Sequence, residues 1–333
     1  MKLRIISLIV ACSMIFTACG TEKATEDNSV QTEQKAVSAT TGGTMTIAMH
    51  KPETLNPIKN RDNTVDKVLR LVYEPLFVVD ENMQVVPNLA ESYTISGNTV
   101  TLKLKSGVKW DDGTEVTASD LTYTLGQLED AELDTIYKSC AENITSYSKV
   151  DNTTVKISYS KGLGSIGYSL CFPVIPKHYY SNKNVDELKP VGNGSYKFDN
   201  YTIVKEMNLS ASSTGLKGTP YITNINVKIM PDIDTEFQSL EAGVIDTAIV
   251  DINNLGSIST ELSSNAVEFP TNQFEFIGFN IKNPMFSNVS VRQGFAHLIP
   301  RENIISDIYI DKMKESVTPI NPANSYTSKV GED

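Results

Sequence analysis

The chain has 333 residues, of which 40% are apolar, 21% charged and 8% aromatic, and this composition excludes a mainly disordered, collagenous or disulfide-framework protein. Its 29 basic and 40 acidic residues give a formal charge of −11, which argues against a nucleic-acid partner, because the phosphates require a basic surface. Three histidines and four cysteines, with no CxxC, no HExxH and no close Cys/His cluster, leave almost no material for a metal site.

The first 43 residues are expected to direct and tether the chain. Lys2 and Arg4 precede an apolar stretch over residues 5–16, which predicts a signal peptide over residues 1–18. A retained membrane-spanning anchor is the weaker alternative, because a span needs about 20 residues of helix. Thr17 and Ala18 before Cys19 resemble a bacterial lipobox, so Cys19 is the expected lipidation site. Residues 20–43 lack aromatic residues and sustained apolar periodicity, so we expect residues 19–43 to form a flexible linker that begins at the lipidated cysteine.

From residue 44 onward the pattern predicts short strands mixed with helices. Strands are expected at 45–49 and 99–105, the second with Val100, Leu102 and Leu104 on one buried face. Thr117 and Asp120 have the spacing of a capping box, which predicts a helix over about 118–128. Further strands are expected at 154–159, 195–201, 225–230, 247–250 and 274–280, and a helix at 235–242.

The last organised segment is predicted to be helical. Asn288 can cap a helix over 289–298, and Pro300 suits the first turn of a following helix through about residue 310. Strands and helices alternate without a regular βα order, which predicts a mixed α/β (α+β) fold class.

The sequence contains no motif for catalysis or for a nucleotide cofactor. GxSxG, GxxxxGK[ST] and a helix-opening GxGxxG are missing from it, so we expect a non-enzyme without cofactors. Cys140 and Cys171 leave two alternatives open, a disulfide in an oxidising exterior or two buried free thiols. Trp110 at a strand end is expected in the core rather than against a ligand.

Seven motifs in order resemble the bacterial extracytoplasmic solute-binding proteins of family 5, which serve oligopeptide and dipeptide ABC importers. They are LNP at 55–57, YEPL at 73–76, PNLAESY at 87–93, GVKWDDGT at 107–114 with TASD at 117–120, VGNGSYKF at 191–198, LEAGVID at 240–246, and FN at 279–280 through VRQ at 291–293. The resemblance covers essentially residues 45–310 and is carried most specifically by the stretch around Trp110.

The resemblance implies a periplasmic-binding-protein-like II clamshell. A solute-binding region would occupy residues 44–310, with lobe I from 44–85 and 190–300 and lobe II from 86–189. Family members continue past this point, so residues 311–333 are expected to begin a truncated C-terminal lobe, most of which the sequence lacks.

The resemblance also implies where a ligand binds. The expected ligand-binding residues are Arg61, Asp62 and Asn63 after the LNP motif, Ile249 and Val250 after GVID, and Thr271 before FN. For Arg61, Asp62 and Asn63 the alternative is an ordinary polar loop.

The function implied is that of a monomeric, lipid-anchored component on the extracytoplasmic face of the cell membrane. It would bind oligopeptides or dipeptides and deliver them to ABC permease subunits. The alternatives are a truncated, binding-deficient remnant, a scaffold for a non-peptide solute such as a nickel chelate, or an adhesin or sensor that binds a protein.

Overall fold

The structure is a computed structural model that describes residues 39–130, 132–163, 167–182, 185–250, 252, 254, 265–269, 271, 273–316 and 318. Two compact units divide the chain, Met1–Ala39 and Thr40–Asp333, and the fold below belongs to the second. The predicted signal peptide, Cys19 and most of the predicted linker lie outside the described residues.

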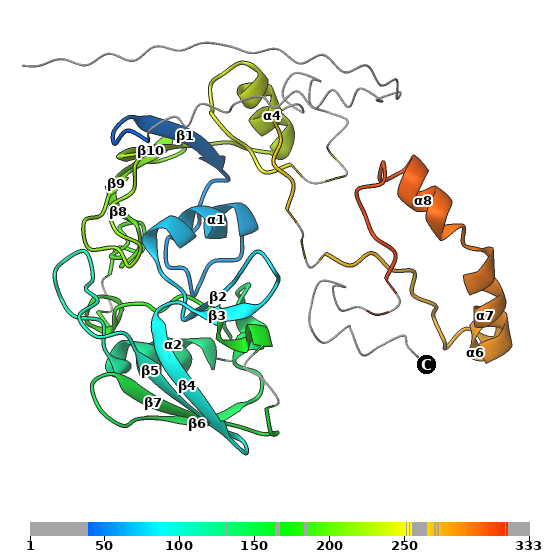
Figure 1. The fold of residues 1–333 in the computed structure, drawn as a ribbon, viewed down its shortest axis with the longest axis horizontal. Coiled ribbons are helices and arrows are strands. Elements are labelled where there is room, and N and C mark those ends of the chain that lie inside the picture. Colours follow the sequence, from blue (N-terminus) through cyan, green and yellow to red (C-terminus); the bar gives the residue numbers. More distant parts are fainter. Residues whose placement is uncertain are drawn as a thin grey trace, which may run out of the picture. The chain divides into compact units, whose positions relative to one another are not determined.

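A four-stranded mixed sheet combines the N-terminal strand with three strands from much later in the chain (Figure 1). Its order is β1 (Thr44–Met49), β10 (Asn224–Ile229), β9 (Glu206–Ala211), β8 (Tyr196–Thr202). The β1–β10 pair is parallel and the other two pairs are antiparallel. Ile225 and Val227 of β10 are buried while Asn224 is exposed, so one face of the sheet covers the core.

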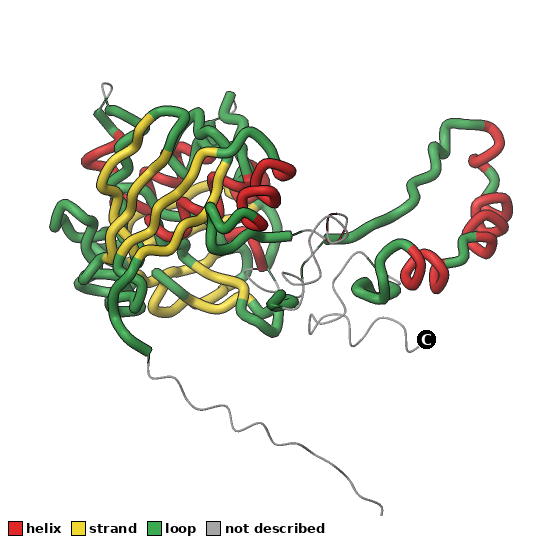
Figure 2. The backbone as a smooth tube through the Cα atoms, turned by 90° about the horizontal axis from the view of Figure 1, so that it is seen from above, coloured by secondary structure: helices red, strands yellow, loops and turns green. Residues whose placement is uncertain are grey.

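A second four-stranded sheet is antiparallel throughout, and its strands are drawn in yellow in Figure 2 together with those of the first. Its order is β4 (Ala90–Ser96), β5 (Thr99–Leu104), β7 (Thr154–Tyr159), β6 (Ile144–Lys149). Val100, Leu102 and Leu104 are fully buried, which confirms the alternation predicted for this strand. A short hairpin of β2 (Phe77–Val79) and β3 (Val85–Pro87) precedes this sheet in the chain.

Helices cover the sheets. Helix α1 (Asn63–Val72) packs against β1 and β8, and α2 (Ala118–Leu128) packs against β6, β7 and α3 (Lys177–Tyr180). The predicted capping box of α2 is confirmed. The Thr117 side chain accepts from the backbone N–H at the third helical position, Asp120, and the Asp120 side chain accepts from the Thr117 backbone N–H. The described part of the chain also contains the short 3₁₀ helices η1 (Lys138–Cys140) and η2 (Gly167–Leu170). Helix α4 (Ile233–Glu241) confirms a predicted helix.

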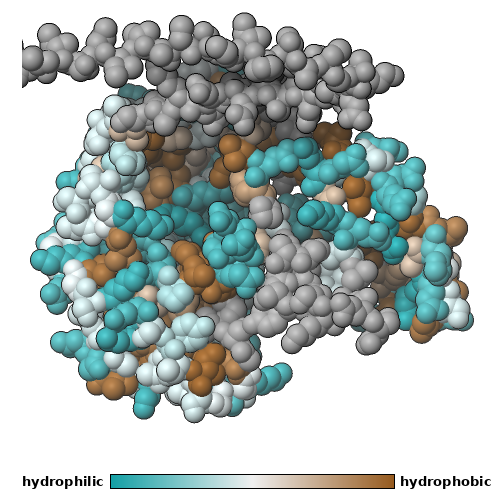
Figure 3. All heavy atoms as spheres, in the orientation of Figure 1, coloured by the Kyte–Doolittle hydropathy of each residue, from teal (hydrophilic) through white to brown (hydrophobic). Residues whose placement is uncertain are grey.

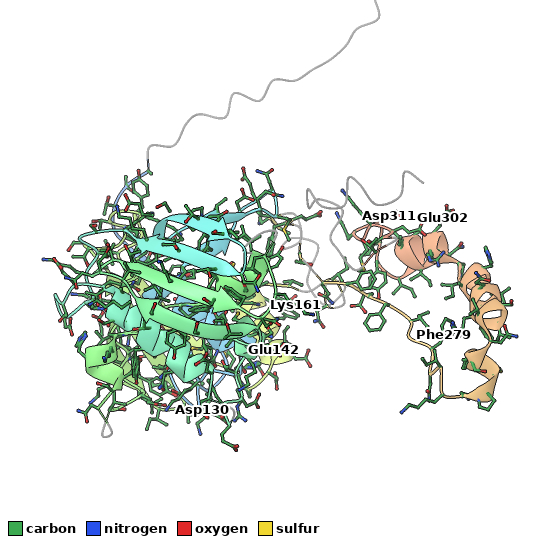
Figure 4. The ribbon with its side chains drawn as sticks, turned by 90° about the horizontal axis from the view of Figure 1, so that it is seen from below. Asp130, Glu142, Lys161, Phe279, Glu302 and Asp311 are labelled. Atoms are coloured by element: carbon green, nitrogen blue, oxygen red, sulfur yellow. The ribbon has the colours of Figure 1, made fainter. Side chains whose placement is uncertain are left out.

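Within residues 273–316 the chain forms helices α6 (Pro284–Ser287), α7 (Val289–Leu298) and α8 (Arg301–Asp307). Asn288 caps α7 by accepting from the Ser290 backbone at 2.9 Å, as predicted. The ring of Phe279, labelled in Figure 4, contacts Phe286 and Phe295 at centroid distances of 5.2 and 6.0 Å. Hydrophobic side chains are also exposed along this segment, seen as brown among teal in Figure 3.

Two predicted strands, 247–250 and 274–280, are wrong, because the structure has extended chain there without strand pairing. A strand requires a neighbour that supplies its backbone hydrogen bonds. Just before residue 247, Asp246 binds the outer edge of β1 through two hydrogen bonds, which we call the Asp246 clasp. The Asp246 backbone donates to the Thr46 carbonyl at 2.8 Å, and the Asp246 side chain accepts from the Thr46 backbone at 2.6 Å. The remaining predicted strands at 45–49, 99–105, 154–159, 195–201 and 225–230 are confirmed within one residue or two at their ends.

One hydrophobic cluster runs through both four-stranded sheets. It includes Leu209 and Val227 from the first sheet, Leu102 and Ile157 from the second, and residues of α1 and α2. Trp110 is 1% exposed within it, which confirms the predicted core position. The division into lobes at residues 85 and 190 stays a prediction.

A close crossing of backbones joins the end of α1 to residues 192–194. The Val72 carbonyl accepts from both Asn193 and Gly194 backbone N–H groups, at 3.0 and 2.8 Å. A Cβ at Gly192 would lie 2.0 Å from that carbonyl oxygen, so only glycine permits this approach. Asp111 completes the junction through two hydrogen bonds with the Gly192 backbone, at 2.8 and 3.0 Å.

Replacement of Gly192 by alanine should lower the free energy of unfolding by about 3 kcal/mol, because the new methyl group must push apart two backbone segments. Urea unfolding of the chain measures this loss. The control is Gly294→Ala in α7, where a Cβ meets no atom within 4 Å. A Gly192→Ala chain as stable as the Gly294→Ala chain would contradict the crossing.

The junction also predicts a pH dependence. Burial raises the pKa of Asp111 from its ordinary 3.8 to about 6, although its hydrogen bond from Gly192 acts in the opposite direction. The folded chain therefore keeps this proton to a higher pH than the unfolded chain does. The contribution of Asp111 to stability is therefore most favourable below about pH 4 and is lost as the pH rises through about 6.

Asp111→Asn should therefore gain stability relative to the parent chain between pH 4 and pH 7, as urea unfolding at several pH values would measure. Asp112→Asn is the matched control with the opposite sign. Burial opposes ionisation of Asp112, but hydrogen bonds from Thr114 and His178 lower its pKa overall, so its amide variant should lose stability at pH 7. Parallel pH curves for the Asp111→Asn chain and its parent would contradict the assignment.

Candidate ligand-binding loop

The 53–63 loop, which contains the LNP motif, connects β1 to α1 and is fixed from outside by Glu187. The backbone carbonyl of Glu187 accepts from Leu55 N–H at 2.9 Å. Its carboxylate accepts from the Thr54 hydroxyl at 2.9 Å and from the Lys59 ammonium at 2.6 Å. Glu187, which lies more than 120 residues later in the sequence, thus binds three residues of the loop.

Buried Asn60 fixes the loop from inside. Its carbonyl accepts from the Ile136 backbone at 3.2 Å and from the Thr135 hydroxyl at 3.1 Å. Its side chain exchanges hydrogen bonds with the Asp62 backbone, at 2.7 and 3.1 Å. Arg61 and Asp62, two of the residues expected to bind a ligand, therefore lie on a loop whose backbone is already ordered.

Arg61 extends from this loop between two exposed carboxylates. Its guanidinium pairs with Glu53 and lies 3.5 Å from an oxygen of Asp134. The hydrogen bond and charge of Glu53, followed by those of Asp134, raise the pKa of Arg61. Arg61 is 54% exposed and the two carboxylates about 80%, so another carboxylate can replace either partner without the burial of an unpaired charge.

Asp62 caps α1 and faces a histidine. Its carboxylate accepts from the Thr64 and Val65 backbones at 2.7 and 3.2 Å, and it lies 2.8 Å from His50 Nδ1. Burial opposes ionisation, but the hydrogen bonds from Thr64, His50 and Val65 lower the pKa of Asp62 overall. These bonds give Asp62 a structural role, whereas its neighbour Asn63 is the exposed first residue of the helix. A role of either in ligand binding stays a prediction.

The structure places the other three predicted residues on separate segments. Ile249, 48% exposed, and half-buried Val250 lie on the extended chain after the Asp246 clasp. Exposed Thr271 lies between α4 and α6 and accepts from the Gln273 backbone at 3.3 Å. None of the six predicted residues lines the surface hollow over β1, β9 and β10 or the small pocket beside α1.

A buried polar cluster beside the loop was missed from the sequence. Asp66 of α1 is 6% exposed, and its carboxylate accepts from the Tyr137 hydroxyl at 2.6 Å and from Arg70 Nε at 2.8 Å. These three side chains line a narrow pocket together with Pro57 and Tyr73. The Asp66/Arg70 spacing of four residues was the available signal, since it is that of an ion pair on a helix.

No group of three or more His, Cys, Asp or Glu side chains in the described part of the chain could hold a metal ion. None of the helices described is long and apolar enough to cross a membrane.

Known proteins share both this sequence pattern and this fold. The family model described as bacterial extracellular solute-binding proteins, family 5 Middle, matches residues 84–333. The oligopeptide-binding protein AppA of Bacillus subtilis is 25% identical over 344 residues, which cover 96% of this chain and 61% of that protein.

Solved structures agree with the sequence match. AppA of Bacillus subtilis in complex with a nonapeptide superposes with a TM-score of 0.64 at 24% identity, over 86% of this chain and 60% of that one. The ABC transporter substrate-binding protein CtaP of Listeria monocytogenes superposes with a TM-score of 0.68 at 25% identity, over 81% of this chain and 57% of that one. NikZ of Campylobacter jejuni in complex with Ni(L-His) superposes with a TM-score of 0.67 at 23% identity, over 85% of this chain and 59% of that one.

The fold is therefore that of the periplasmic-binding-protein class. Because the family model matches three quarters of its residues, the chain belongs to the bacterial extracellular solute-binding proteins of family 5. The chain spans about 60% of the length of AppA.

The capping role of Asp62 can be separated from a role in ligand binding. Asp62→Ala should lower the free energy of unfolding by about 1–2 kcal/mol, because two backbone N–H groups of α1 lose their acceptor. Asp62→Asn keeps a capping oxygen and should lose clearly less. Thermal or urea unfolding without ligand measures both, and equal stability of the alanine variant and the parent would contradict the cap.

Proposed function

We propose that this chain is the substrate-binding component of a peptide-type ABC importer, and that it binds an oligopeptide or dipeptide outside the cytoplasmic membrane. The observation that carries the proposal is the family match over residues 84–333 together with the similarity to an oligopeptide-binding protein along 96% of the chain. A non-enzymatic role is consistent with this family and with a sequence that lacks catalytic motifs.

The 53–63 loop supports Arg61 as a ligand contact. A peptide has a terminal carboxylate, and a guanidinium donates two parallel hydrogen bonds to such a group. Arg61 is exposed, and its present partners Glu53 and Asp134 are exposed as well. The backbone beneath it is ordered by buried Asn60, so little conformational entropy is lost when a ligand binds.

A non-peptide solute on the same scaffold is the alternative that a specific observation favours. The structure of NikZ, with a TM-score of 0.67, holds Ni(L-His), which is a chelate of an amino acid. Such a ligand also presents a carboxylate. A screen must therefore contain free amino-acid chelates beside peptides.

Purified chain from residue 19 onward, with Cys19→Ser, should show a saturable rise in melting temperature with particular peptides, because a ligand that binds only the folded state stabilises it. Di- to hexapeptide pools and nickel–histidine are the probes, and calorimetry confirms the hits. A shift with nickel–histidine alone would favour the alternative. No shift with any probe would contradict the proposal and favour a binding-deficient remnant.

Arg61→Ala should weaken binding of the peptide found in this way about tenfold or more, which corresponds to the loss of one charge-assisted hydrogen bond. The matched control is Lys103→Ala, which removes an equally exposed cation that pairs with Glu91 on the second sheet. Equal weakening in both variants, or none in Arg61→Ala, would remove Arg61 from the site while the function itself still stood.

Membrane attachment through a lipid on Cys19 is also part of the proposal, supported by the small residues before Cys19 and the apolar stretch that precedes them. In a bacterium that processes lipoproteins, the parent chain should be labelled by a fatty-acid analogue and sediment with membranes. Cys19→Ser should be unlabelled and leave the membrane fraction, while Cys12→Ser serves as the control. Labelling of the Cys19→Ser chain would exclude Cys19 as the site.

A further inference from the structure

Cys140 and Cys171 meet at one backbone oxygen. Cys140 is the last residue of η1, Cys171 directly follows η2, and the two short helices pack against each other. The Cys140 thiol donates to the Tyr168 carbonyl at 3.9 Å, and the Cys171 backbone donates to the same oxygen at 3.1 Å. Both are free, half-buried thiols in the structure, and a disulfide between them stays a prediction.

The surroundings of the two thiols are apolar. Both side chains are half-buried and pack against the main hydrophobic cluster. Burial raises the pKa of each thiol to about 11, and the charge of Cys140 acts in the same direction on Cys171. At neutral pH both thiols are largely protonated, so exchange with an external disulfide must proceed through a small thiolate fraction and is slow.

We propose that Cys140 and Cys171 are a dithiol site that a low-molecular-weight disulfide oxidises to an intramolecular bridge between η1 and η2. One cysteine loses its proton and attacks the external disulfide, which releases one small thiol and leaves a mixed disulfide. The second cysteine then attacks the mixed disulfide at the protein sulfur and releases the other small thiol. Two electrons pass from the protein sulfurs to the external disulfide, which becomes two thiols.

The bridge would act on the segment that supports the 53–63 loop. Tyr137, three residues before Cys140, donates to Asp66 of α1, and the neighbouring Thr135 and Ile136 hold the carbonyl of Asn60. A link from Cys140 to Cys171 would tie this segment to η2 and restrict the unfolded chain over residues 140–171. The oxidised chain should therefore resist local opening beside the loop.

The test treats the full chain with oxidised glutathione, blocks remaining thiols with N-ethylmaleimide and digests it for mass spectrometry. A peptide pair that joins Cys140 to Cys171 is the expected product. In a Cys12→Ser, Cys19→Ser chain, the same oxidation should raise the melting temperature by roughly 5–10 °C, and dithiothreitol should reverse the rise.

Cys140→Ala and Cys171→Ala are the matched controls, and each should stop at one mixed disulfide with no such rise. The proposal is overturned if the parent chain carries two glutathiones, if both thiols are alkylated after oxidation, or if Cys140 is joined to another cysteine. An equal rise in the Cys140→Ala chain would also overturn it, since the stabilisation would then come from the modification and not from the bridge.

Discussion

Two hydrogen bonds on one oxygen, the carbonyl of Val72, are the constraint on which the rest of this fold depends. They bring residues 193 and 194 against the end of α1, at a distance that leaves no room for a Cβ at Gly192. From this crossing the chain enters β8 and builds three of the four strands in the first sheet. Asp111 joins the same point from the segment after β5, so three regions of the sequence become fixed by one short contact.

The consequence for the site is a rigid support with a polar rim. Because one hydrophobic cluster runs through both sheets, the 53–63 loop rests on a continuous core. Asn60 and Glu187 then hold the loop from two sides, and among the charged side chains of the loop Arg61 is the one that lies between two largely exposed carboxylates. Such an arrangement separates the residues that fix the backbone from the one that can exchange partners.

Local signals predicted much of the fold, and contacts distant in sequence account for what could not be predicted. The capping box at Thr117 and the alternation around Leu102 depend on neighbouring residues only, and both are confirmed. Helix α1 was missed although its buried residues have helical spacing, whereas the strands at 247–250 and 274–280 failed because pairing needs a partner that no local pattern reveals. For the site, the sequence indicates an exposed polar loop, but the burial of Asp66 depends on Tyr137, 71 residues away.

The clasp between Asp246 and Thr46 has a consequence for how the chain meets other copies of itself. β1 is an edge strand, and an open edge of backbone groups is a template for pairing with another molecule. Asp246 occupies both the N–H and the carbonyl of Thr46 in the middle of that edge. A foreign strand cannot form a continuous ladder along β1, so the clasp protects the sheet from edge-to-edge aggregation.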